Sequence, residues 1–324
     1  MNKRLALFLL LVFIITGCSS NEQSSSTSDR LKIGVMLSDV GLGDQSFSDS
    51  AFSGLEQARD ELGILFDYRE LADVGDYETG LEALIQEDND LIIGLGYMIE
   101  DALKKVAEKY PEKQFVIVDS KVDLPNVTSV TFKEHEGSFL IGAVAGMNSE
   151  SNIVGFIGGE DTLLIRKFLN GYKQGVAATN PDAVVVERFA GDFGNDKLGE
   201  QLAKELIDEG ADYIYPSAGF TGVGVIHVAQ QEGVYSFGVD TDQYNLGEKT
   251  VVTSMLKNID VAMKMIAEEL VENGNLTTKH LNLGLNENGV GIAPIRIISL
   301  TKEEQKQLEN LTNDIQSGAI TVTE

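Results

Sequence analysis

Cysteine, tryptophan and histidine are scarce in this chain, which has one, none and three of them among 324 residues. A single cysteine cannot form a disulfide within the chain. The three histidines, His135, His227 and His280, lie far apart and have no second ligand at metal-like spacing. We therefore expect surface or helix-packing histidines, and we predict neither a metal site nor a cofactor.

The common catalytic and phosphate-binding motifs are also missing. The chain has no serine in a G-x-S-x-G turn, no G-x-x-x-x-G-K-[ST] loop and no strand-linked G-x-G-x-x-G. The glycine-rich segment 219–224 has a different spacing. A helix start there could cradle a phosphate, but the acids near it disfavour a polyanion. These absences favour a binding protein over an enzyme.

Basic residues are outnumbered by acidic ones. Lys and Arg total 25 against 51 Asp and Glu, which gives a net charge of −26. Such an acidic chain repels nucleic-acid phosphates and anionic lipid surfaces. We therefore exclude nucleic acid as a partner, and we exclude membrane binding through a basic patch.

The N-terminus predicts export and a lipid anchor. Lys3 and Arg4 precede a short apolar run over 5–15, and Thr16-Gly17-Cys18 follows, as in a signal peptide with a bacterial lipobox. In that pattern Cys18 carries the lipid and becomes the first mature residue. The alternative is a plain signal peptide with an incidental cysteine. The Ser-rich segment after Cys18 is a polar tether with nothing to bury.

Apolar strands alternate with amphipathic helices almost to the end of the chain, a pattern typical of parallel sheets covered by helices on both faces. The predicted strands are 32–37, 65–70, 91–95, 114–119, 127–131, 152–158, 183–189, 211–215, 234–239, 249–254 and 290–298. The predicted helices are 52–62, 77–87, 100–109, 134–147, 163–177, 196–207, 222–231, 259–273 and 302–317.

The pattern restarts near residue 150, so we predict an α/β fold with two doubly wound parallel-sheet lobes joined by a hinge. The predicted segments are a signal peptide (1–17), a lipidated tether (18–30), an N-terminal lobe (31–148 plus 254–280) and a C-terminal lobe (149–250 plus 282–324). A cleft between two such lobes is the default ligand site.

The polar loop after the first strand is the best candidate for ligand contact, because ligands bind at the carboxyl edge of parallel sheets. Phe47 and Phe52 lie there beside Asp44 and Asp49. Aromatic rings next to hydrogen-bonding groups suit a flat, polar-edged ligand such as a nucleobase. The alternative is that one or both phenylalanines belong to the core at the helix entry.

Several segments in order resemble the basic membrane protein family of bacterial nucleoside-binding lipoproteins, the substrate-binding subunits of ABC importers. The matching segments are 44–47 (D-Q-S-F), 95–97, 115–119, 136–142 (E-G-S-F-L-I-G), 154–159, 168–172, 212–215, 238–243 and 253–257 (T-S-M-L-K). The chain departs from the family at Ser48, where relatives have Asn, at Gly43, and at Tyr97, whose hydroxyl many relatives lack. The resemblance implies a fold like that of type I periplasmic binding proteins.

The same resemblance implies that a purine lies between aromatic rings from opposite lobes, Phe52 or Phe47 from the first and Phe193 from the second. Asp119 and the Asp44 loop would contact polar edges of the base. The alternatives are that Asp119 only terminates its strand and that Phe193 is a core residue.

For the sugar, the resemblance implies that Asp240 accepts hydrogen bonds from ribose hydroxyls, that Lys257 donates to them and that Gly219 lets the backbone approach. Asp240 and Lys257 could also pair with each other. The alternatives are a turn or capping role for Asp240 and a solvated surface position for Lys257.

Together these features predict a monomeric lipoprotein on the extracytoplasmic face of the cell membrane, which captures a purine nucleoside and passes it to ABC permease subunits. Three alternatives stay open: a sensor or regulatory lipoprotein on the same fold, a binder of another small polar solute such as a sugar, and an enzyme such as a nucleoside hydrolase. The enzyme would need a metal-carboxylate cluster that the sequence does not supply.

Overall fold

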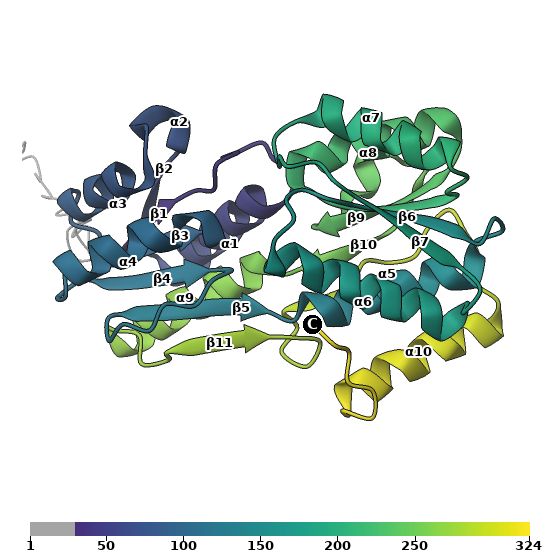
Figure 1. Cartoon of the computed structure of the whole chain (residues 1–324). Coiled ribbons are helices and arrows are strands. Elements are labelled where there is room, and N and C mark those ends of the chain that lie inside the picture. The colour runs from purple at the N-terminus through teal and green to yellow at the C-terminus, as the bar shows by residue number, and fades with distance from the viewer. Residues whose placement is uncertain (1–29) are drawn as a thin grey trace, which may run out of the picture. The chain divides into compact units, whose positions relative to one another are not determined.

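Two six-stranded sheets with helices on both faces make up the described part of the chain, residues 30–324 of a computed structural model (Figure 1). The predicted signal peptide, Cys18 and all of the predicted tether except Arg30 lie outside these residues. No helix within 30–324 combines the length and the apolar character that a membrane span needs. The predicted α/β class with two doubly wound lobes is confirmed.

The first sheet has the strand order β11-β5-β4-β3-β1-β2, and all its pairs are parallel. Helices α1 and α9 pack together on one face, and α3 and α4 pack on the other. Its elements are β1 Lys32–Met36, α1 Phe47–Leu62, β2 Leu65–Arg69, α2 Leu71–Val74, α3 Tyr77–Gln86, β3 Leu91–Leu95, η2 Tyr97–Ile99, α4 Glu100–Lys109, β4 Gln114–Val118, β5 Val127–Phe132, α9 Ile259–Asn273 and β11 His280–Leu283.

The second sheet has the order β12-β10-β9-β8-β6-β7, and only the β10–β12 pair is antiparallel. Helices α5 and α6 run side by side on one face, with α7 and α8 on the other (Figure 1). Its elements are α5 Glu134–Asn148, β6 Ile153–Gly158, α6 Leu163–Thr179, β7 Val184–Phe189, α7 Asp196–Asp208, β8 Tyr213–Ser217, α8 Gly219–Glu232, β9 Tyr235–Asp240, η3 Gln243–Leu246, β10 Val251–Lys257, β12 Val290–Ile292 and α10 Lys302–Gln316.

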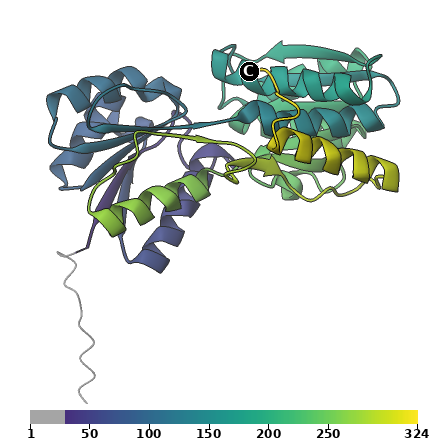
Figure 2. The same ribbon diagram turned by 90° about the horizontal axis from the view of Figure 1, so that it is seen from below.

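The chain passes between the lobes at Lys133, at Asn258 and over residues 284–289. These crossings differ from the predicted lobe boundaries. Helix α5 belongs to the second lobe because it packs on α6, and α10 lies along it in turn (Figure 2). Strand β10 stays in the second sheet as far as Lys257, and β11, which no sequence pattern predicted, completes the first sheet.

Glycines bring α5 and α6 unusually close together. A Cβ on Gly142 would lie 2.1 Å from the Tyr172 carbonyl oxygen, and one on Gly175 would lie 1.9 Å from the Phe139 carbonyl oxygen. Real atoms cannot approach so closely, so the two helices can meet only backbone to backbone at these positions. This close contact fixes α5, and with it the first crossing, to the second lobe.

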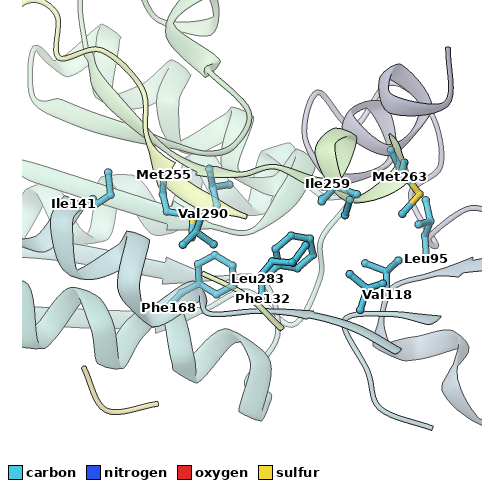
Figure 3. Close-up of a cluster of buried hydrophobic side chains, with 14 of the residues drawn as sticks. Leu95, Val118, Phe132, Ile141, Phe168, Met255, Ile259, Met263, Leu283 and Val290 are labelled. Carbon is cyan, nitrogen blue, oxygen red and sulfur yellow. The ribbon is translucent and has the colours of Figure 1, made fainter. Parts of the chain in front are cut away.

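The largest cluster of buried apolar side chains is continuous through both lobes. Figure 3 shows Leu95 and Val118 from the first sheet, and Met255 and Val290 from the second. Between them lies Phe132 at the end of β5, one residue before the first crossing. The connecting segments are therefore anchored in packed core on either side of the cleft.

Candidate functional site

A cavity opens where the carboxyl ends of strands from both sheets meet. It holds about 640 Å³ of empty space, including its opening to solvent. Open α/β sheets bind ligands at this edge. The lining residues are Ser38, Asp39, Val40, Asp44, Phe47, Gly96, Tyr97, Met98 and Asp119 from the first lobe, and Leu164, Ile165, Phe168, Phe193, Ser217, Ala218, Gly219, Val239, Asp240 and Lys257 from the second.

Of the eight predicted ligand residues, Phe52 is the one that does not line this cavity. Its ring meets Phe66 edge-on at 5.3 Å and Tyr68 edge-on at 5.6 Å between ring centres. Phe52 therefore belongs to the packing of α1 against β2, the core alternative stated above. Phe47, five residues earlier on α1, lines the cavity instead.

Helix α1 begins at Phe47, five residues before the predicted start, because Asp44 organises the loop. Its carboxylate accepts hydrogen bonds from the backbone amides of Ser46 at 2.9 Å, Ser48 at 2.7 Å and Asp49 at 3.2 Å. Burial raises the pKa of Asp44 to about 6, although the hydrogen bonds from these amides lower it. Asp44 thus caps the N-terminus of α1, because it accepts hydrogen bonds from amides that have no partner within the first turn.

Among residues 30–324, Lys257 at the end of β10 is the only buried cation that lines the cavity, and its side chain is 2% exposed. Its ammonium lies 2.6 Å from Asp119 Oδ2 and 3.2 Å from Glu134 Oε1. Burial lowers the pKa of Lys257, but the carboxylates of Asp119, Glu134 and Asp240 outweigh it and hold the pKa above its ordinary value. Lys257 is therefore charged, and the surface alternative for it does not hold.

Aromatic faces complete the surroundings of that ammonium. It lies 5.3 Å from the ring centre of Phe47, 5.1 Å from that of Phe132 and 5.7 Å from that of Phe168. A desolvated cation over aromatic faces gains about 2 kcal/mol per favourable contact. The rings and the carboxylates together make it feasible to keep a charge in this site.

Asp119 and Asp240 occupy equivalent positions, directly after β4 and at the end of β9. Their φ angles are +66° and +63°, in the left-handed region that non-glycine residues rarely adopt. Such strain costs about 1–3 kcal/mol per residue and is common at ligand sites. Burial raises the pKa of Asp240 despite the opposing effect of Lys257, and the Ser46 hydroxyl donates a hydrogen bond to its Oδ2.

Phe193 is held in the cavity wall by neighbours that lack side chains. A Cβ on Gly159 would lie 2.2 Å from its ring, and one on Gly219 would lie 3.3 Å from its carbonyl oxygen. The same carbonyl accepts a hydrogen bond from the Thr221 amide at 2.9 Å. Gly219 has a φ of +54°, so both its conformation and its contact with Phe193 favour glycine.

Sequence reasoning missed several residues at this site. Phe168 was predicted only as part of a helix with family likeness, and it supplies a further aromatic ring to the cavity, beside Phe47, Tyr97 and Phe193. Glu134, which lies outside the cavity lining, was assigned to a helix start with no charge partner. Glu134 and Lys257 are 123 positions apart in the sequence, so no local sequence pattern could have predicted that they pair.

Direct hydrogen bonds cross the cleft beside the cavity. The Gln45 carbonyl oxygen accepts from Gln243 Nε2 at 3.0 Å and from the Thr241 hydroxyl at 3.3 Å. The Tyr97 hydroxyl donates to the carboxylate of Glu160. Together with the Ser46–Asp240 and Lys257–Asp119 contacts, these bonds hold the two lobes against one another around the cavity.

A family model described as "ABC transporter substrate-binding protein PnrA-like" matches residues 31–324. The chain is 32% identical to the CD4+ T-cell-stimulating antigen of Listeria monocytogenes, over 100% of this chain and 99% of that protein. It is 30% identical to the ABC transporter nucleoside-binding protein BmpA of Lactococcus lactis, over 98% of this chain and 97% of that one.

Solved structures agree with the fold. An ABC transporter solute-binding protein from Aeropyrum pernix has a TM-score of 0.82 at 25% identity, over 90% of this chain and 92% of that one. A transcriptional activator of the comK gene from Bacillus halodurans has a TM-score of 0.77 at 22% identity, over 89% of this chain and 98% of that one, a likeness of fold alone.

Proposed function

Because the chain belongs to the Bmp family of ABC transporter substrate-binding proteins, we propose that it binds a purine nucleoside in the cleft between its lobes and delivers it to ABC permease subunits. One observation carries the ligand class: the cavity combines aromatic rings from both lobes with a buried lysine and carboxylates. A nucleoside has both matching parts, a flat base and a ribose with hydroxyl groups. A relative named as nucleoside-binding supports the same choice.

In this proposal the base lies against Phe47 from the first lobe and Phe193 from the second. Aromatic pairs contribute about 0.5–1.5 kcal/mol beyond burial. Asp240 accepts hydrogen bonds from the ribose through its free oxygen, since Ser46 occupies the other. Lys257 donates to the sugar, and hydrogen bonds to charged groups contribute about 1.5–3 kcal/mol each.

Binding would be coupled to lobe closure. The ligand stabilises the closed form only to the extent that it contacts both lobes at once. Residues from both lobes line the cavity, so a bound nucleoside would add contacts that the open form lacks. The hydrogen bonds that cross the cleft would act in the same direction.

We also propose that the protein is held on the extracytoplasmic face of the membrane by a lipid on Cys18, with the Ser-rich segment as its tether. Labelling of cells with radioactive palmitate tests this anchor. Label should appear on the parent protein and not on a Cys18→Ala variant. Label on the variant would contradict it.

Calorimetric titration with guanosine, inosine, adenosine, cytidine, free ribose and glucose tests the ligand class. We expect heat of binding with the purine nucleosides and none with glucose, and loss of that signal in Asp240→Ala with an unchanged circular dichroism spectrum. The affinity should change little between low and high salt, because a nucleoside is neutral. Binding of glucose alone would favour a sugar-binding protein, and release of free base would indicate an enzyme.

A further inference from the structure

Lys257 forms ion pairs with two carboxylates of different origin, and it donates a hydrogen bond to one of them, Asp119. Asp119 lies at the end of β4 in the first lobe, whereas Glu134 opens α5 in the second. The Nζ–oxygen distances are 2.6 Å to Asp119 and 3.2 Å to Glu134. An ammonium has three N–H donors, so the hydrogen bond to Asp119 leaves donor capacity for a further acceptor in the cavity.

Glu134 has no other function that the described residues explain. Its side chain is 1% exposed, and neither carboxylate oxygen accepts a hydrogen bond of normal geometry within residues 30–324. It does not line the cavity. A buried carboxylate with open acceptor positions costs several kcal/mol in solvation unless a charge compensates it, and the Lys257 ammonium is the cation it contacts.

The positions of the two carboxylates relative to the hinge separate their roles. Lys257 ends β10 directly before the crossing at Asn258, and Glu134 follows directly after the crossing at Lys133, so both belong to the second lobe. Asp119 belongs to the first lobe. When the lobes separate, the contact from Lys257 to Asp119 is the one that lengthens, while the contact to Glu134 stays within one rigid unit.

We propose that Glu134 is a positioning residue that holds the Lys257 ammonium at the cleft in the open protein, so that the lysine meets the ligand already oriented. The inference rests on the proposed function, because the ligand contact of Lys257 belongs to it. Asp119 then closes on the lysine from the other lobe. The pairing preorganises the donor and reduces the ordering that binding would otherwise require.

The charges around Glu134 make this pairing sensitive to pH. Burial has the largest effect on the pKa of Glu134 and raises it, and the nearby carboxylate of Asp119 raises it too. The positive charges of Lys257 on β10 and Lys167 on α6 lower it. The resulting pKa is about 7. Asp240 faces the same ammonium. Protonation of Glu134 near neutral pH therefore weakens its hold on the lysine.

The test compares Glu134→Gln, which keeps the size and removes the charge, with Glu82→Gln, which removes an equal charge at the exposed pair with Lys109. Calorimetry with guanosine at pH 8 should show about a tenfold loss of affinity for Glu134→Gln, the scale of one weakened charge-assisted hydrogen bond, and none for Glu82→Gln. In a Lys257→Met background, Glu134→Gln should have no further effect, since it acts through the lysine.

The parent protein provides a second measurement that needs no variant. Its affinity should fall about threefold from pH 8 to pH 6.5 as Glu134 takes up a proton, and this fall should disappear in Glu134→Gln. Equal or tighter binding by Glu134→Gln, or an equal loss in the Lys257→Met background, overturns the inference while the proposed function stands. A parent protein that binds none of the nucleosides overturns the proposed function and the inference together.

Discussion

Replacing Lys257 with methionine would leave two buried carboxylates without their cation. The side chains of Lys257, Asp119 and Glu134 are 2%, 5% and 1% exposed. Removing one partner from a buried ion pair costs about 3–5 kcal/mol, because the remaining charge has neither water nor a counter-ion. We expect Lys257→Met to lose that much of the free energy of unfolding at pH 8, measured by urea denaturation followed by circular dichroism.

The loss should depend on pH in one direction only. With the lysine present, the pKa of Glu134 is about 7, above its ordinary value because of burial. Without the ammonium that pKa rises further, so the variant's folded state keeps a proton that the parent releases. The variant therefore loses stability relative to the parent as the pH rises through 7, by about 1–2 kcal/mol more at pH 8 than at pH 5.5.

Lys109→Met is the matched control, because Lys109 pairs with Glu82 at 2.6 Å with its own side chain 56% exposed. Exposed pairs of this kind contribute little to stability because water screens them, so Lys109→Met should change the free energy of unfolding far less than Lys257→Met does, and equally at both pH values. If Lys257→Met loses less than about 1 kcal/mol at pH 8, or the same amount at both pH values, the reasoning about the buried cluster is wrong.

Three further predictions concern the cavity and the lobes. Phe193→Ala should weaken nucleoside binding at least tenfold by calorimetry, because its ring lines the cavity, whereas Phe52→Ala should leave the affinity unchanged. Equal effects of the two substitutions would contradict the assignment of Phe52 to helix packing. Gly175→Ala should lower the free energy of unfolding by about 1–3 kcal/mol, because the added methyl group would collide with α5. Gly291→Ala should not lower it, because Gly291 has open space around it. An unchanged stability of Gly175→Ala would refute the close helix contact. Tyr97→Phe should speed nucleoside dissociation several-fold in stopped-flow measurements, through loss of one hydrogen bond across the cleft, and an unchanged rate would show that this bond does not favour closure.

The sequence pattern was sufficient for the fold class because hydrophobic periodicity is a local property. Strand β3 and helices α4 and α9 have the predicted bounds, since each is a continuous apolar or amphipathic run. Strand β11 was missed because its four residues, two of them exposed, give too short a pattern. The start of α1 was misplaced because the Asp44 carboxylate, rather than an apolar repeat, determines it.

The site could be predicted in part for a related reason. Residues at the ends of parallel strands converge on one edge of a sheet, which is where the predicted strands place Asp119 and Asp240, but the resemblance to a known family is what singled these two residues out. Which of two phenylalanines on one helix turns toward the cleft is a question of helix rotation, and only the packing of α1 against β2 answers it. That packing places Phe52 against Phe66 and Tyr68 of β2 and leaves Phe47 for the cavity.

By itself, then, the chain determined the two α/β lobes, because their strands and helices are short runs of residues with a local pattern, and its resemblance to a known family singled out seven of the residues that line the cavity. The assignment of α5 and β10 to the second lobe, and the meeting of Glu134 with Lys257, were decided only by tertiary structure. The physical reason is distance along the chain: these contacts depend on backbone approach and charge compensation between segments that share no local pattern.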